Sequence, residues 1–246
     1  MLYQFIALLL GAAYFTLLWL RIEPLEQRLF WLLGFAVFVS LINLLFHRKE
    51  LARTSDLTFL LLPIFWIFGS AMIVILQPTG FLRFFASVAT LLGFLMIELR
   101  LRVRSDNLRF IDTMLLLSAV GLFVGVWAFD FYLKPEWWIL LIAVFGITES
   151  LLWYGFYRTP LIPREKLIFS LTTAFLLTQA SWALLMWPLH YITTAGVLTG
   201  FFYLTYELVS THMRGELNRQ KILFHVIFIF LIEAVLLSTA QWLPVI

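Results

Sequence analysis

Long runs of apolar residues follow one another along the whole chain and are separated by short polar segments. Runs of about 20 apolar residues have the helix length that crosses the hydrocarbon core of a bilayer. Helices are required because lipid offers no partner for backbone N–H and C=O groups, and no alternating pattern indicates a barrel. The pattern predicts an all-α fold, a polytopic transmembrane helical bundle of about nine spans, near residues 2–20, 29–46, 57–76, 81–99, 110–133, 137–157, 167–187, 191–211 and 222–243.

The composition agrees with a lipid environment. Of the 246 residues, 63% are hydrophobic and 13% are charged, whereas an ordinary soluble domain is roughly 45 to 50% apolar. Because the apolar runs leave only short loops, we expect a single integral membrane domain over residues 1–246. Nucleic-acid-binding and nucleotide-binding modules are therefore excluded. The expected partners are the lipid bilayer, other membrane proteins or a lipid ligand.

The chemistry available to the chain is also restricted. There is no cysteine, which removes thiol catalysis, disulfides and Cys-ligated metals. No HExxH, Walker or aspartate-rich prenyl-diphosphate motif occurs, so neither a metal nor a cofactor is expected. The first apolar run has no basic n-region and no small-residue cleavage site, and we expect it to stay as a span rather than be removed as a signal peptide.

Lysine and arginine residues indicate the orientation, because they gather in alternate loops. Thirteen of the 17 lysine and arginine residues belong to one set of loops: Arg48, Lys49, Arg53, Arg100, Arg102, Arg104, Arg109, Arg158, Arg164, Lys166, Arg214, Arg219 and Lys221. The other loops hold Arg21, Arg28, Arg83 and Lys134. The positive-inside rule makes the first set cytoplasmic. We therefore expect a multi-pass protein of the cell (inner) membrane with a cytoplasmic N-terminus and an external C-terminus.

Tryptophan residues agree with this orientation. Six of them fall at the ends of spans that the basic residues place outside, namely Trp19, Trp31, Trp137, Trp138, Trp187 and Trp242. Tryptophan is enriched at membrane–water interfaces because its ring is apolar and its N–H is polar.

Six ionisable side chains are expected near the cytoplasmic ends of spans, at one depth: Glu98, Asp112, Glu149, Glu207, His212 and His225. Such groups can relay protons, hold a metal or act as a general acid and base. Glu98 is two residues from Arg100, and Asp112 and His212 lie near span ends, so we expect these three to reach water at the interface. Glu149 and Glu207 are roughly 13 and 10 Å from the next arginine along a helix, and either a structural or a functional role stays open for both.

Glu233 is the most deeply placed formal charge, 12 residues beyond Lys221. Gln179, 13 residues beyond Lys166 on a span of the same direction, lies at a similar height. One interpretation is a buried hydrogen bond between Glu233 and Gln179 that holds two helices together. The other is that Glu233 carries a proton or a cation, since an isolated carboxyl group at this depth favours its neutral form.

Glycine recurs inside the spans. Gly69 precedes Ser70, and the GxxxG pairs are Gly121 with Gly125 and Gly196 with Gly200. Small residues let two helix backbones approach closely, so these positions predict close helix packing.

One stretch of the chain carries a resemblance to a known family. Residues 149–156 read ESLLWYGF, which is similar to the first motif of the CAAX-processing and bacteriocin-protection (CPBP) intramembrane proteases, EExxxR followed by Gly and an apolar residue. Gln179 ends FLLTQ where that family has FxxxH, and His225 begins HVIFI where the family has HxxxN or HxxxD. The resemblance covers roughly the last hundred residues. It departs from the family pattern at Ser150, Tyr154, Gln179 and Ile229.

The resemblance implies an intramembrane endopeptidase in which Glu149 is the base that activates water and His225 binds the water or the oxyanion. Because the motifs are incomplete, the sequence favours an integral membrane protein without intact catalytic motifs that acts as a binding, scaffold or complex-subunit protein. The alternatives are a small proton-coupled carrier that uses Glu233, and a divergent CPBP-like endopeptidase.

Reporter fusions test the predicted topology. Fusions at Arg53, Arg104, Arg164 and Gly215 lie in the loops with most basic residues, so all four should report the cytoplasm in intact cells. A single fusion that reports the external side would break the count of nine spans.

Overall fold

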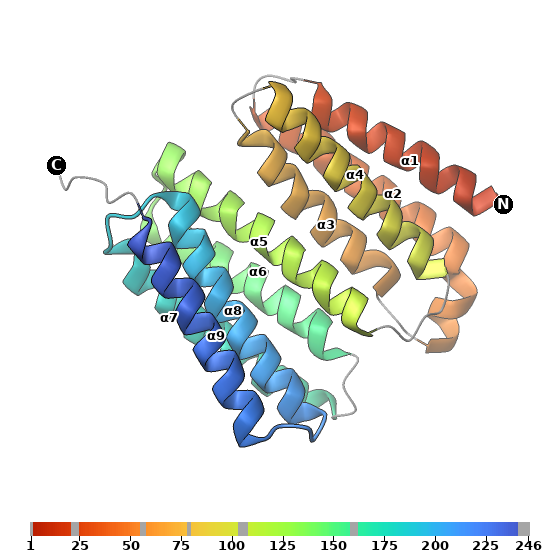
Figure 1. Ribbon diagram of the computed structural model, residues 1–246. Coiled ribbons are helices and arrows are strands. Elements are labelled where there is room, and N and C mark those ends of the chain that lie inside the picture. Colours follow the sequence, from red (N-terminus) through yellow and green to blue (C-terminus); the bar gives the residue numbers. More distant parts are fainter. Residues whose placement is uncertain are drawn as a thin grey trace. The chain divides into compact units, whose positions relative to one another are not determined.

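The computed structural model describes residues 2–20, 25–54, 58–77, 80–102, 108–157 and 162–240. Nine helices occupy nearly all of these ranges (Figure 1): α1 (Leu2–Trp19), α2 (Leu25–Thr54), α3 (Thr58–Ile75), α4 (Gly80–Arg102), α5 (Leu108–Leu133), α6 (Trp137–Tyr157), α7 (Pro163–Leu185), α8 (Tyr191–Met213) and α9 (Arg219–Ser238). The predicted all-α fold is therefore confirmed.

Eight of the helices in the described ranges are long and apolar enough to cross a membrane. The other is α3, whose apolar part, Leu60–Ile75, is shorter and contains Pro63. The protein is thus a multi-pass membrane protein, while a ninth span stays a prediction. Residues 57 and 241–243 of the predicted spans lie outside the described residues, as do four residues used to predict the topology: Arg21, Arg104, Arg158 and Trp242.

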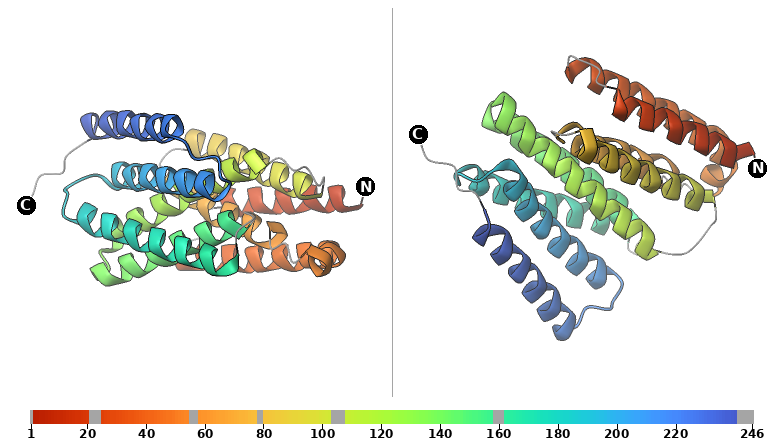
Figure 2. Two further views of the ribbon diagram at one scale, coloured as in Figure 1. Left: turned by 90° about the horizontal axis from the view of Figure 1, so that it is seen from below. Right: turned by 45° about the horizontal axis from the view of Figure 1, so that its top comes forward.

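The chain forms two compact units, residues 1–122 and 123–246, with the boundary inside α5. In the first unit α1 packs on α4, α4 on α3 and α3 on α2. In the second unit α6 packs on α7 and α8 on α9, and the latter pair lies side by side in both views of Figure 2. The single membrane domain expected from the sequence stays a prediction.

Close packing is confirmed where α3 meets α5 in the first unit. A Cβ atom added at Gly69 would run into the backbone oxygen of Ser118, and one added at Gly121 would run into the backbone oxygen of Gly69. The two helix backbones are therefore in direct contact, which only glycine permits at these positions.

Two arginines of the first unit complete the end of α1. Arg28 Nη2 donates to the Leu20 backbone oxygen at 3.3 Å, and Arg83 Nη2 donates to the Leu18 oxygen at 3.1 Å. The last carbonyl groups of a helix lack helical partners and carry partial negative charge, so buried guanidinium groups are stabilising there. These two of the four basic residues expected on the external side thus have a structural role.

Local sequence also explains where α9 begins. Gly215 has a φ of 70°, which turns the chain after α8. Asn218 then caps α9, because its side-chain oxygen accepts from the Lys221 backbone N–H at 2.8 Å. In the same turn the Lys221 ammonium lies 3.0 Å from Glu216 Oε2 and lowers the pKa of that carboxyl group.

Candidate functional site

Glu98 on α4 is the centre of a buried polar cluster in the first unit. The Tyr3 hydroxyl of α1 donates to Glu98 Oε2 at 2.6 Å, and Asn43 Nδ2 of α2 donates to Glu98 Oε1 at 3.1 Å. Glu98 and Asn43 are completely buried. The expectation that Glu98 reaches water is therefore wrong, because two hydrogen bonds from neighbouring helices replace the water.

Sequence reasoning missed Tyr3 and Asn43 as partners of Glu98. The available signal was depth, since Tyr3 is near the chain start, Asn43 is five residues before Arg48 and Glu98 is two residues before Arg100. All three therefore fall near the cytoplasmic ends of their predicted spans. The cluster ties α1, α2 and α4 together, and its carboxylate already has donors on both oxygens.

Glu149 lies on α6 in the second unit and joins it to α7. Ser170 Oγ donates to Glu149 Oε1 at 2.8 Å. The other carboxyl oxygen, Oε2, is buried and has no hydrogen-bond partner among the described residues. Small buried residues on α7, including Ser170, Ala174 and Ser181, let the two helices pack closely enough for this contact.

His225 on α9 lies between two polar side chains of α8. Its Nδ1 is 3.1 Å from the Tyr203 hydroxyl, and its Nε2 is 3.9 Å from Glu207 Oε1. The side chains of His225 and Glu207 are both partly buried. The structure thus brings together two of the sequence candidates, Glu207 and His225, and adds Tyr203, which sequence reasoning did not single out.

The two residues of the CPBP-like hypothesis have different partners. Glu149 is bonded to α7, whereas His225 contacts α8. Within the described part of the chain, no hydrogen bond or ion pair joins them, and a shared water stays a prediction. No group of three or more His, Asp or Glu side chains in that part is arranged to hold a metal ion.

Glu233 on α9 is 9% exposed and faces Gly200 on α8, where an added Cβ atom would collide with Glu233 Oε1. Both carboxyl oxygens are buried without a hydrogen-bond partner among the described residues. Gln179 is exposed on α7. The predicted Glu233–Gln179 hydrogen bond is therefore wrong: Gln179 lies off the buried face of α7 that holds Leu177 and Ser181, and α9 packs on α8.

The Glu98 cluster predicts a large effect on stability. Glu98→Ala removes the carboxylate that accepts from the Tyr3 hydroxyl and the Asn43 amide. The Tyr3 hydroxyl keeps a second acceptor, Asn43 Oδ1 at 3.1 Å, so we expect a total cost of roughly 1 to 3 kcal/mol. The unfolding temperature in detergent should therefore fall clearly. Glu136→Ala removes an exposed carboxylate and serves as the control, which should leave the unfolding temperature unchanged. Equal effects of the two changes would contradict the stabilising role of the cluster.

Comparisons with known proteins identify a family but no individual relative. No curated protein and no solved structure matches the chain. A family model described as a protein of unknown function (DUF5656) matches residues 45–239. This match includes all of α3 to α9 and hence Glu98, Glu149, His225 and Glu233, whereas Tyr3 and Asn43 lie before it. Because the match covers more than half of the chain, the protein belongs to the DUF5656 family.

Proposed function

We propose that this protein is a membrane-embedded subunit of a complex, in which α9 packs against a transmembrane helix of another protein molecule. The observation that carries the proposal is the carboxyl group of Glu233, which is buried with no hydrogen-bond partner in the described part of the chain. A buried polar group left unsatisfied costs roughly 1 to 3 kcal/mol. A partner outside the chain would recover much of this cost, provided that the Glu233 side chain turns away from Gly200 of α8, where it is buried, to meet the partner helix.

The depth of Glu233 favours a protein partner over a lipid. Glu233 is 12 residues beyond Lys221, which is about 18 Å along the helix axis, and the hydrocarbon core is about 30 Å thick. Lipid tails at this depth carry no hydrogen-bonding group. The missing partner is therefore best supplied by a polar side chain or a free backbone group of another helix.

The surface of α9 leaves room for such a helix. Only Ile229 and Glu233 of α9 are buried, and α9 lies beside α8 at the edge of the second unit (Figures 1 and 2). Its most exposed side chains are large and apolar: Leu223, Phe224, Phe230, Leu231 and Val235. Apolar surface of this kind suits lipid and a partner helix equally, and the unsatisfied carboxyl group of Glu233, buried between α8 and α9, is what favours a partner helix.

The same carboxyl group favours a second candidate function, a small proton-coupled carrier, because a group that binds and releases a proton needs no permanent partner. A third and weaker candidate is the CPBP-like endopeptidase. Glu149 Oε2 accepts no hydrogen bond among the described residues and so has a lone pair free for a catalytic base, but this oxygen is buried and the reaction would require water to reach it.

Single-cysteine cross-linking tests the complex-subunit proposal. The chain has no native cysteine, so a photo-cross-linker can be attached at one introduced thiol. In native membranes Phe230→Cys on α9 should give an adduct of defined mass. Ile142→Cys on α6 is the matched control, since Phe230 and Ile142 are 72% and 63% exposed, and it should give none. Adding Glu233→Leu should weaken the association about 5- to 30-fold, equivalent to 1 to 2 kcal/mol.

Two outcomes would contradict this proposal. Equal adducts at positions 230 and 142, or no adduct at either, would show that α9 faces lipid. An adduct of twice the 28.7 kDa chain mass would identify the partner as a second copy. Proton flux into liposomes that Glu233→Gln abolishes, at an unchanged unfolding temperature, would favour the carrier instead.

A further inference from the structure

A hollow of about 50 Å³ opens in the second unit, where the end of α5 meets the α7–α8 turn and the start of α8. Its polar and aromatic lining includes Trp127, Asp130, Phe131, Trp187, Tyr191 and Thr194. The apolar spans of α5 and α7 end here, and that of α8 begins here. The hollow therefore lies at the level of lipid headgroups, where Trp and Tyr are enriched.

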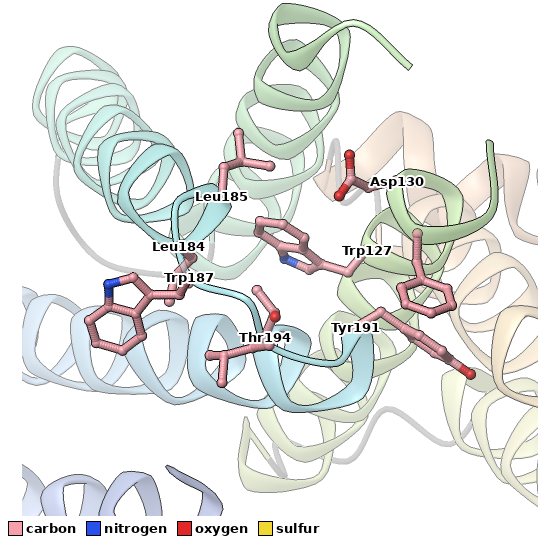
Figure 3. A pocket seen from close by; sticks show the side chains of 9 residues that line it. Trp127, Asp130, Leu184, Leu185, Trp187, Tyr191 and Thr194 are labelled. Atoms are coloured by element: carbon pink, nitrogen blue, oxygen red, sulfur yellow. The ribbon is translucent and has the colours of Figure 1, made fainter. Parts of the chain in front are cut away.

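Trp127 gives the hollow an unused hydrogen-bond donor. The residue is 3% exposed, and its Nε1–H is buried without a partner among the described residues. Figure 3 shows its indole ring in the middle of the lining group, with Asp130 on one side and Thr194 on the other. Because Trp127 lines the hollow, an acceptor bound there that reached the indole N–H would satisfy it.

Asp130 gives the hollow a negative charge that the described residues leave unpaired. It lies three residues after Trp127 and therefore on the same side of α5. Within the part of the chain that the structure describes, its carboxylate makes no hydrogen bond or ion pair, although Lys134 follows four residues later. Asp130 is in the last turn of α5, where the helix dipole disfavours an anion. A bound cation would neutralise the unpaired carboxylate and offset its unfavourable interaction with the helix dipole.

We propose that this hollow binds a primary ammonium group linked through two carbons to an oxygen, which is the chemistry of an ethanolamine headgroup. The ammonium group pairs with Asp130, and the ligand oxygen accepts from Trp127 Nε1–H. The aromatic rings of Phe131 and Tyr191 add cation–π attraction. This site is separate from Glu233 and goes beyond the proposed complex-subunit function.

The size of the hollow selects among organic cations. A water molecule needs roughly 10 to 15 Å³ of such volume, so about 50 Å³ accommodates roughly three to five water-sized atoms. An ethanolamine unit fits within this space, whereas the trimethylammonium group of choline, with its linker and oxygen, has too many atoms to fit entirely inside and would extend through the open side of the hollow. The site should therefore prefer a primary ammonium group to a quaternary one.

Lipid retention and amine titration test the proposal on the purified full-length protein. Native mass spectrometry follows which lipid the protein keeps from an equimolar mixture of phosphatidylethanolamine and phosphatidylcholine. Calorimetry follows binding of free ethanolamine and of choline. We expect retention of phosphatidylethanolamine over phosphatidylcholine, and no choline binding. Additional binding of free ethanolamine would support the same site with a soluble source of the headgroup.

Variants tie the binding to the hollow. Asp130→Asn removes the charge at constant size and should weaken binding at least about tenfold, because it removes a charge-assisted hydrogen bond. Trp127→Phe removes the N–H and should also weaken binding. Glu136→Gln changes an exposed carboxylate just beyond α5 and should have no effect. Equal retention of both lipids with no binding of either amine, or lipid selectivity that survives Asp130→Asn, would overturn the proposal.

Discussion

Inside a bilayer a polar side chain can be satisfied only by other groups of protein, and this constraint organises what the structure shows. Glu98 obeys it completely, since Tyr3 and Asn43 bond both of its oxygens. In Glu149 only one of the two carboxyl oxygens has a partner, the Ser170 hydroxyl. Neither carboxyl oxygen of Glu233 has a hydrogen-bond partner in the part of the chain that the structure describes. The series runs from Glu98, which makes a structural polar contact, to Glu233, for which we propose a partner outside the chain.

Helix positions were predictable from the sequence, whereas helix faces were not. Apolar runs of bilayer length determine where helices form, and the observed helices follow the predicted spans. Position along a helix axis was also readable, since it follows from residue number alone. Rotation about the helix axis, which decides the face that each helix buries, could not be predicted. Residues on every face of these helices are apolar, and no amphipathic pattern marks the buried side. The Glu233–Gln179 bond failed for this reason.

The two sites on which the proposals rest could be predicted from the sequence to different degrees. Glu233 was identified as an exceptional residue from its depth alone, and the structure added that its oxygens are unpaired. The hollow beside Trp127 and Asp130 was missed, because one tryptophan among ten carries no signal and an aspartate near a span end resembles any interfacial residue. The position of Asp130 in the last turn of a helix, against the helix dipole, was the clue available.

The central claim is that the hydrogen-bond partner of Glu233 comes from outside this chain. The most direct test is the unfolding temperature of the isolated Glu233→Leu protein in detergent. Replacing an unsatisfied buried carboxyl group by an apolar side chain removes a desolvation cost and breaks no internal hydrogen bond. The variant should therefore be at least as stable as the parent protein. A loss of stability of roughly 1 kcal/mol or more would show that Glu233 has a partner within the chain and would contradict the account.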